Sequence, residues 1–197
     1  MKAKDKHGWI NDYRKPFLWG TTIIFIGAWF FVDPILPFSY PARNLMEGFG
    51  ALFLIFGVLG RIFSSLTIAS HKDSCVVKTE MYSIVRHPLY FFSFVMVVGI
   101  GLMTGRIELL LYLIAMFLVC FYPMIMNEEK YLKEKFGKEY TEYQKEVPGF
   151  IPNISKWRAR EKIEINMRLV TKTMRDASLF LLIIPAVEVV EFIKSLM

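Results

Sequence analysis

The feature that most constrains this fold is a series of apolar segments long enough to cross a lipid bilayer as helices. Four segments qualify at a helical rise of 1.5 Å per residue, at about 17–32, 46–69, 88–105 and 107–126. A fifth segment, 177–193, contains a proline and two glutamates, so whether it crosses the bilayer stays open. Because 54% of the residues are hydrophobic and 16% aromatic, the composition favours a membrane protein. The sequence therefore predicts an all-α, polytopic membrane protein with four to five transmembrane helices.

The positive charges are distributed as the positive-inside rule requires. Five Lys and Arg residues precede residue 17, three lie between 71 and 87, and twelve lie between 127 and 176. The expected outer connections hold only Arg43 and Arg106. This asymmetry predicts a cytoplasmic N-terminus. It also indicates that the net charge of +6 reflects membrane topology and contact with anionic lipids rather than binding of nucleic acid. The charged first sixteen residues indicate no cleavable signal peptide.

A polar cluster stands where the third apolar segment begins. Arg86 and His87 precede Pro88, which fits the first turn of a helix. The positive end of that helix favours an anionic group nearby. The third and fourth segments are of similar length and meet at a tight turn around 104–106, so Arg86 and His87 should lie on the same membrane face as Glu128 and Glu129. Two clusters that are distant in sequence are thus predicted to form one site.

The residues after Glu129 predict an amphipathic helix that can cover this site as a cytoplasmic lid. Apolar side chains recur there at three- to four-residue spacing. They are Leu132, Phe136, Tyr140, Tyr143 and Val147. Gly137 is placed to break the helix, and Val147-Pro148 to end it.

These side chains suit an amphiphilic ligand with a cation for the carboxylates, an anion for Arg86 and His87, and a flat part for the aromatic lid. S-adenosylmethionine has these groups, and a reduced nicotinamide dinucleotide fits less well. The glycines between 99 and 105 lie inside a span and follow no strand, so they indicate helix packing rather than a nucleotide loop. We expect no metal site, because neither Cys75 nor Cys120 has the neighbours of one.

Three motifs together resemble the isoprenylcysteine carboxyl methyltransferases and their phospholipid methyltransferase relatives. They are Tyr82-x-x-Val85-Arg86-His87-Pro88-x-Tyr90, then Glu128-Glu129-x-x-Leu132-x-x-x-Phe136-Gly137-x-x-Tyr140-x-x-Tyr143, and Val147-Pro148-x-Phe150-x-Pro152. The resemblance covers about 75–155 and implies a membrane enzyme that binds S-adenosylmethionine on the cytoplasmic side and takes a lipophilic acceptor from the bilayer. The family's common glycine two residues before the first tyrosine is Glu80 here, and an arginine shortly before the acidic pair is absent.

Carried onto this chain, the resemblance implies catalytic roles for Arg86 and Glu129. The implied cofactor-binding residues are Tyr82, His87, Pro88, Tyr90, Glu128, Glu129 and Tyr140. It also implies one integral membrane domain in a bacterial or archaeal plasma membrane, with a helical hairpin at 17–70, a catalytic segment at 71–155 and a C-terminal extension at 156–197.

Two other functions remain open at this point. Sterol reductases have a C-terminal region similar to this hairpin, which would make the protein a membrane reductase dependent on a nicotinamide cofactor. A lipid-binding membrane protein without enzymatic activity is the other alternative. The acceptor, the oligomeric state and the role of Arg61, an arginine within the second apolar segment, are not determined by the sequence.

Overall fold

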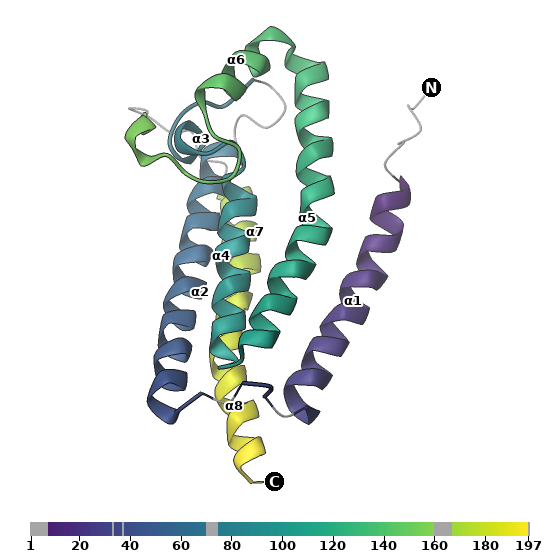
Figure 1. The fold of residues 1–197 in the computed structure, drawn as a ribbon. Helices are drawn as coiled ribbons and strands as arrows, with labels where there is room; N and C mark the ends of the chain where they lie inside the picture. Colours follow the sequence, from purple (N-terminus) through teal and green to yellow (C-terminus); the bar gives the residue numbers. More distant parts are fainter. Residues whose placement is uncertain (1–7, 33, 37, 70–74, 160–166, 197) are drawn as a thin grey trace.

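A computed structural model describes residues 8–32, 34–36, 38–69, 75–159 and 167–196. Its regular elements, in chain order, are α1 (Gly8–Phe31), α2 (Tyr40–Ala69), α3 (Met81–Ile84), α4 (Pro88–Met103), α5 (Ile107–Phe136), α6 (Lys138–Glu146), η1 (Ile154–Lys156), α7 (Met167–Ser178), η2 (Leu179–Leu182) and α8 (Ile183–Ser195). All the elements in these ranges are helical, which confirms the all-α prediction. Figure 1 shows the long helices side by side, with α3 and α6 at one end and the C-terminus at the other.

Two helices, Tyr40–Ile68 and Ile107–Phe136, are long and apolar enough to cross a membrane. Trp19–Phe31 and Pro88–Met103 are shorter apolar helices, and the sixteen residues of α4 span about 24 Å at the helical rise. These apolar helices favour a membrane protein.

Two predicted boundaries were wrong. The second apolar segment was expected to begin near residue 46, but α2 begins at Tyr40. Pro41 lies in its first turn, where a missing N–H costs no helical hydrogen bond. The fourth apolar segment was expected to end near 126, yet α5 continues to Phe136 as one helix that contains Pro123. The amphipathic residues after Glu129 therefore extend the membrane helix before the chain turns at Gly137.

Helices α2 and α4 form the centre of the bundle because glycines let their backbones approach closely. A Cβ atom on Gly50 would lie 2.7 Å from the carbonyl oxygen of Gly99, and one on Gly57 would lie 2.9 Å from that of Phe92. Leu54 and Val58, on the same helix, are almost fully buried. The predicted role of Gly99 in helix packing is confirmed, and Gly50 and Gly57 of α2 act in the same way.

The turn between α4 and α5 forms the predicted hairpin and also ties down α1. Gly105 adopts a φ of +63°, and the Thr104 hydroxyl donates to the carbonyl of Gly101 at 2.7 Å. The buried Arg106 donates to the carbonyl oxygens of Val32 and Ala28, at the end of α1. A cation at the C-terminal end of a helix is favourably placed, and α1 lies on the α5 side of the bundle (Figure 1).

The C-terminal residues run along the bundle as α7, η2 and α8 (Figure 1). The apolar segment predicted at 177–193 is divided by the 3₁₀ turn at Leu179–Leu182, and Val187 belongs to the main apolar core. Glu191 pairs with Arg43, and Lys194 donates to the carbonyl of Trp29 at 3.0 Å. Residues 160–166 of the predicted C-terminal extension, 156–197, lie outside the described residues.

Candidate functional site

The site begins with a buried turn that leads into α4. Tyr82 and Ser83, in the single-turn helix α3, are buried. Glu80, just before it, has φ 49° and ψ −130°, a conformation that favours glycine. The Ser83 hydroxyl holds this turn by donating to the Glu80 carbonyl at 2.6 Å. His87 is then the N-cap residue and Pro88 stands in the first turn of α4, as predicted.

The segment after α6 pairs its backbone with this turn. The Arg86 amide donates to the Pro148 carbonyl at 2.9 Å, and the Asn153 amide donates to the Ile84 carbonyl at 2.9 Å. The Tyr143 hydroxyl, on α6, donates to the Tyr82 carbonyl at 2.6 Å. These bonds fix α6 against the start of α4.

Arg86, His87 and Glu129 form a polar triad around one carboxylate oxygen. Arg86 donates to Glu129 Oε1 from Nη2 at 2.7 Å and from Nε at 3.0 Å, and His87 Nε2 lies 3.0 Å from the same oxygen. The remaining Arg86 donor, Nη1, reaches the carbonyls of Gln144 at 3.0 Å and Val147 at 2.8 Å. The hairpin therefore brings the basic and acidic clusters into contact, as the sequence predicted.

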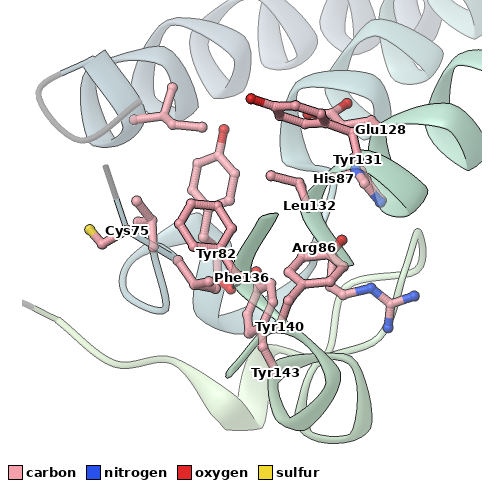
Figure 2. A pocket seen from close by; sticks show the side chains of 13 residues that line it. Cys75, Tyr82, Arg86, His87, Glu128, Tyr131, Leu132, Phe136, Tyr140 and Tyr143 are labelled. Carbon is pink, nitrogen blue, oxygen red and sulfur yellow. Dashed lines mark hydrogen bonds between the residues drawn. The ribbon is translucent and has the colours of Figure 1, made fainter. Parts of the chain in front are cut away.

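Next to this triad is a cavity of about 240 Å³. Its walls come from the end of α2, the turn before α4, the end of α5, and α6 (Figure 2). They are formed by Ile68, Cys75, Val76, Val77, Tyr82, Arg86, His87, Glu128, Tyr131, Leu132, Phe136, Tyr140 and Tyr143. Figure 2 shows the guanidinium of Arg86 directed away from the aromatic side chains.

Several polar groups of the cavity wall have no protein partner. Glu128 makes no hydrogen bond or ion pair with the residues that the structure describes. Tyr140 is 2% exposed, and its buried hydroxyl has no hydrogen-bond partner in the described part of the chain. Burial raises the pKa of Tyr140, with the Glu129 charge adding to the effect, and burial likewise raises the pKa of Tyr82. Both hydroxyls therefore stay protonated at neutral pH and can donate to a ligand.

An aromatic row runs from the site along α4 and α5. Tyr90 lies 5.9 Å from His87 and 5.8 Å from Phe121, measured between ring centroids. Phe121 stacks on Phe117 at 4.4 Å, and Phe94 follows at 5.3 Å. The apolar side of the site is thus continuous with the interior of the helical bundle.

The structure places most of the predicted site residues at the cavity. Five of them line it, namely Tyr82, Arg86, His87, Glu128 and Tyr140. Glu129 lies beside it and holds Arg86 and His87. Pro88 is buried at the start of α4, and Tyr90 reaches the site through its ring contact with His87.

Among the residues of the site that the sequence did not predict are three with polar side chains or a thiol. Gln144 donates to Glu129 Oε2 at 3.2 Å, and Tyr131 and Cys75 line the cavity. Tyr131 lies one helical turn after Glu128, so the periodicity of α5 could have identified it. Cys75 follows the polar loop before α3, and no sequence signal places it there.

The sequence has recognisable relatives. A sequence model of the phospholipid methyltransferase family matches residues 45–139. The nickel-cobalt-cadmium resistance protein NccN of Alcaligenes xylosoxydans xylosoxydans is 30% identical, over 75% of this chain and 70% of that protein. The cobalt-zinc-cadmium resistance protein CzcN of Cupriavidus metallidurans is 27% identical, over 70% of this chain and 63% of that protein.

A protein-S-isoprenylcysteine O-methyltransferase of Schizosaccharomyces pombe is 33% identical, over 48% of this chain and 41% of that enzyme. The chain thus aligns with between 41% and 70% of the length of these relatives. No solved structure matches the chain at a significant level.

Proposed function

We propose that this chain, which belongs to the family of isoprenylcysteine carboxyl methyltransferases and phospholipid methyltransferases, is a methyltransferase that uses S-adenosylmethionine to methylate a lipophilic acceptor. The observation that supports the proposal is the cavity in which Glu128 and the Tyr140 hydroxyl have no partner among the described residues. The Tyr140 hydroxyl is buried, and buried polar groups are normally satisfied. Glu128 is half-buried at the same cavity, so a ligand that pairs with both groups accounts for their placement.

The chemistry of the cavity fits this cofactor. The Glu128 carboxylate can pair with the ammonium group, and the Tyr140 and Tyr82 hydroxyls can donate to anionic or neutral oxygens. The rings of Phe136, Tyr140 and Tyr143 offer flat apolar faces, and ring faces attract a cation by about 0.5–2 kcal/mol. When bound, S-adenosylmethionine supplies an electrophilic methyl group.

The residues of the site then act mainly by positioning. Glu129 holds the guanidinium of Arg86 and the imidazole ring of His87. One edge of that ring therefore has a fixed position at the cavity. Arg86 binds α6 and the segment after it through two backbone carbonyls, and α6 acts as the lid that keeps water away from the reacting groups. Holding donor and acceptor in near-attack geometry can contribute about 7–11 kcal/mol.

We assign the site to the cytoplasmic face of a plasma membrane. The positive charges of the sequence cluster at the ends of the apolar segments that meet near α6. The aromatic row along α4 and α5 gives the apolar part of the acceptor a route from the bilayer. A prenylcysteine-type carboxylate and a phospholipid amine are both acceptors of this kind.

Isothermal titration calorimetry on the detergent-purified protein tests the proposal. We expect S-adenosylmethionine to bind, and Glu129→Ala and His87→Ala to weaken its binding. Heat with a reduced nicotinamide dinucleotide and none with S-adenosylmethionine would favour a reductase instead. A folded protein that binds neither would favour a lipid-binding role and would reject the cofactor assignment.

A further inference from the structure

The segment that follows the lid, residues 150–158, carries large apolar side chains on the surface of the molecule. Ile151 is 78% exposed, Ile154 is 77% exposed and Trp157 is 44% exposed. This return segment lies at the end of the bundle where α3 and α6 stand (Figure 1). Apolar side chains gathered in this way mark a surface that contacts something other than water.

Aromatic contacts at both ends hold the return segment against the membrane helices. The ring of Phe150 lies 5.6 Å from that of Phe94, and the ring of Trp157 stacks on Phe63 at 6.4 Å. Phe94 follows the first residue of α4 by six positions, and Phe63 precedes the last residue of α2 by six. Both contacts therefore reach residues about 9 Å inside the ends of these helices.

That level lies within a bilayer that surrounds the bundle. The sixteen residues of α4 span about 24 Å, which is less than the hydrocarbon thickness of about 30 Å. A hydrocarbon layer centred on α4 therefore extends past both ends of the helix. The return segment, which packs against the first turns of α4, then lies at the boundary between acyl chains and headgroups.

The backbone of the return segment meets the requirement that lipid imposes on polar groups. The Asn153 amide donates to the Ile84 carbonyl at 2.9 Å, and the Arg158 amide donates to the Ser83 hydroxyl oxygen at 3.0 Å. Other amides donate within the segment, and they are those of Ser155, Lys156 and Trp157. Pro152 has no N–H to satisfy. Backbone groups that are already paired can enter a lipid interface without an unsatisfied donor.

The charges beside the apolar side chains complement an anionic lipid surface. Between 145 and 158 the chain carries Lys145, Lys156 and Arg158 against one carboxylate, that of Glu146. Arg158 lies 3.5 Å from Glu146, with more than half of each side chain exposed, and such an exposed pair is weak. Long cationic side chains at this level can reach lipid phosphates while their stems lie along apolar surface.

We propose that the return segment is a membrane-surface anchor. Ile151, Ile154 and Trp157 insert into the leaflet at this end of the bundle, and the neighbouring cations bind anionic phospholipid headgroups. The proposal goes beyond the proposed function, because it needs neither cofactor nor acceptor. The Arg86 and His87 amides donate to the two carbonyls just before the segment, so the anchor also fixes the height of the cavity relative to the leaflet.

Quenching of an added tryptophan by brominated lipids tests the anchor. The full chain and its Ile154→Trp variant are placed in nanodiscs of phosphatidylcholine and phosphatidylglycerol, and the fluorescence of the unaltered protein is subtracted. Phosphatidylcholine brominated near the headgroup end of its acyl chains should quench most of the added fluorescence. Bromine near the methyl end should quench it less, because interfacial side chains lie about 5–10 Å deep. Ile151→Trp should give the same pattern.

Two matched variants serve as controls. Glu142→Trp places the probe at an exposed position on α6 and should be quenched weakly by both lipids. Leu118→Trp places it at an exposed position within α5 and should be quenched more by the deeper bromine.

The proposal is overturned if the probe at 154 or 151 is quenched no more than the probe at 142. Omitting phosphatidylglycerol should weaken the quenching at 154, and an unchanged value would overturn the binding of anionic headgroups. An unquenched probe at 118 would reject the membrane placement of the bundle and the anchor with it. None of these readouts depends on S-adenosylmethionine, so they are independent of the proposed function.

Discussion

Exchanging Glu129 for glutamine should destabilise the protein, whereas the same exchange at Glu128 should not. Glu129 Oε1 receives two hydrogen bonds from Arg86 and lies 3.0 Å from His87 Nε2. Its side chain is 17% exposed and that of Arg86 is 15% exposed. Removing one partner of a fully buried pair costs about 3–5 kcal/mol, and partial solvent access places this pair lower, at about 2–3 kcal/mol.

The assay for this difference is thermal unfolding in detergent. A loss of 1 kcal/mol lowers the Tm of a chain of this size by about 2–4 °C, so a loss of about 2–3 kcal/mol in Glu129→Gln should lower it by about 4–12 °C. Glu128→Gln removes a charge that has no described protein partner, and its Tm should change by about 2 °C or less. In calorimetry, Glu128→Gln should instead lower the affinity for S-adenosylmethionine about 10- to 100-fold, the range for a hydrogen bond to a charged group.

The reasoning would be refuted by the reverse pattern. If Glu128→Gln lowered the Tm as much as Glu129→Gln does, Glu128 would be structural and would not be available to a ligand. If Glu129→Gln left the Tm unchanged, the triad would not hold α5 to the start of α4. Gln144, which donates to Glu129 Oε2 at 3.2 Å, offers a milder probe, since Gln144→Ala removes only a peripheral bond of the same carboxylate.

Three further predictions concern backbone conformation and one buried hydroxyl. Because Glu80 has a positive φ, Glu80→Gly should be about 1 kcal/mol more stable to thermal unfolding than Glu80→Ala. Equal stabilities would show that the backbone at residue 80 is not strained. Gly137→Ala should lower the free energy of unfolding by about 1–2 kcal/mol, because Gly137 has a φ of +55°. A Cβ atom at Gly137 or at Gly48 would meet no atom within 4 Å, so the backbone conformation alone separates the two sites. Gly48→Ala, in a helix, should therefore not lower the free energy of unfolding. Tyr140→Phe should leave the free energy of unfolding of the ligand-free protein unchanged or raise it by about 1 kcal/mol. It should also weaken S-adenosylmethionine binding in calorimetry. A lower free energy of unfolding would indicate that the Tyr140 hydroxyl has a partner in the ligand-free protein.

The contact between Arg86 and Glu129 could be predicted because it depends only on helix lengths. The apolar segments 88–105 and 107–126 are of similar length and are joined by a tight turn, so their far ends return to the same membrane face. The 2.7 Å contact between these side chains agrees with this prediction. The backbone pairing of 147–158 with the turn before α4 could not be predicted. Its hydrogen bonds, such as that from the Glu80 amide to the Arg158 carbonyl, use groups that every residue has and leave no pattern in the sequence.

The different environments of Glu128 and Glu129 follow from the rotation of α5 about its axis. Leu110 is buried, and it precedes Glu128 by eighteen residues, which is five full turns at 3.6 residues per turn. Phe121, seven residues before Glu128, lies on the same stripe and packs against Tyr90. The packing of that stripe against α4 therefore directs Glu128 into the cavity, and Glu129, about 100° further around the helix, turns toward Arg86. The adjacent carboxylates of Glu128 and Glu129 therefore have different surroundings. A rotation of α5 about its axis that exchanged their positions would expose its apolar stripe.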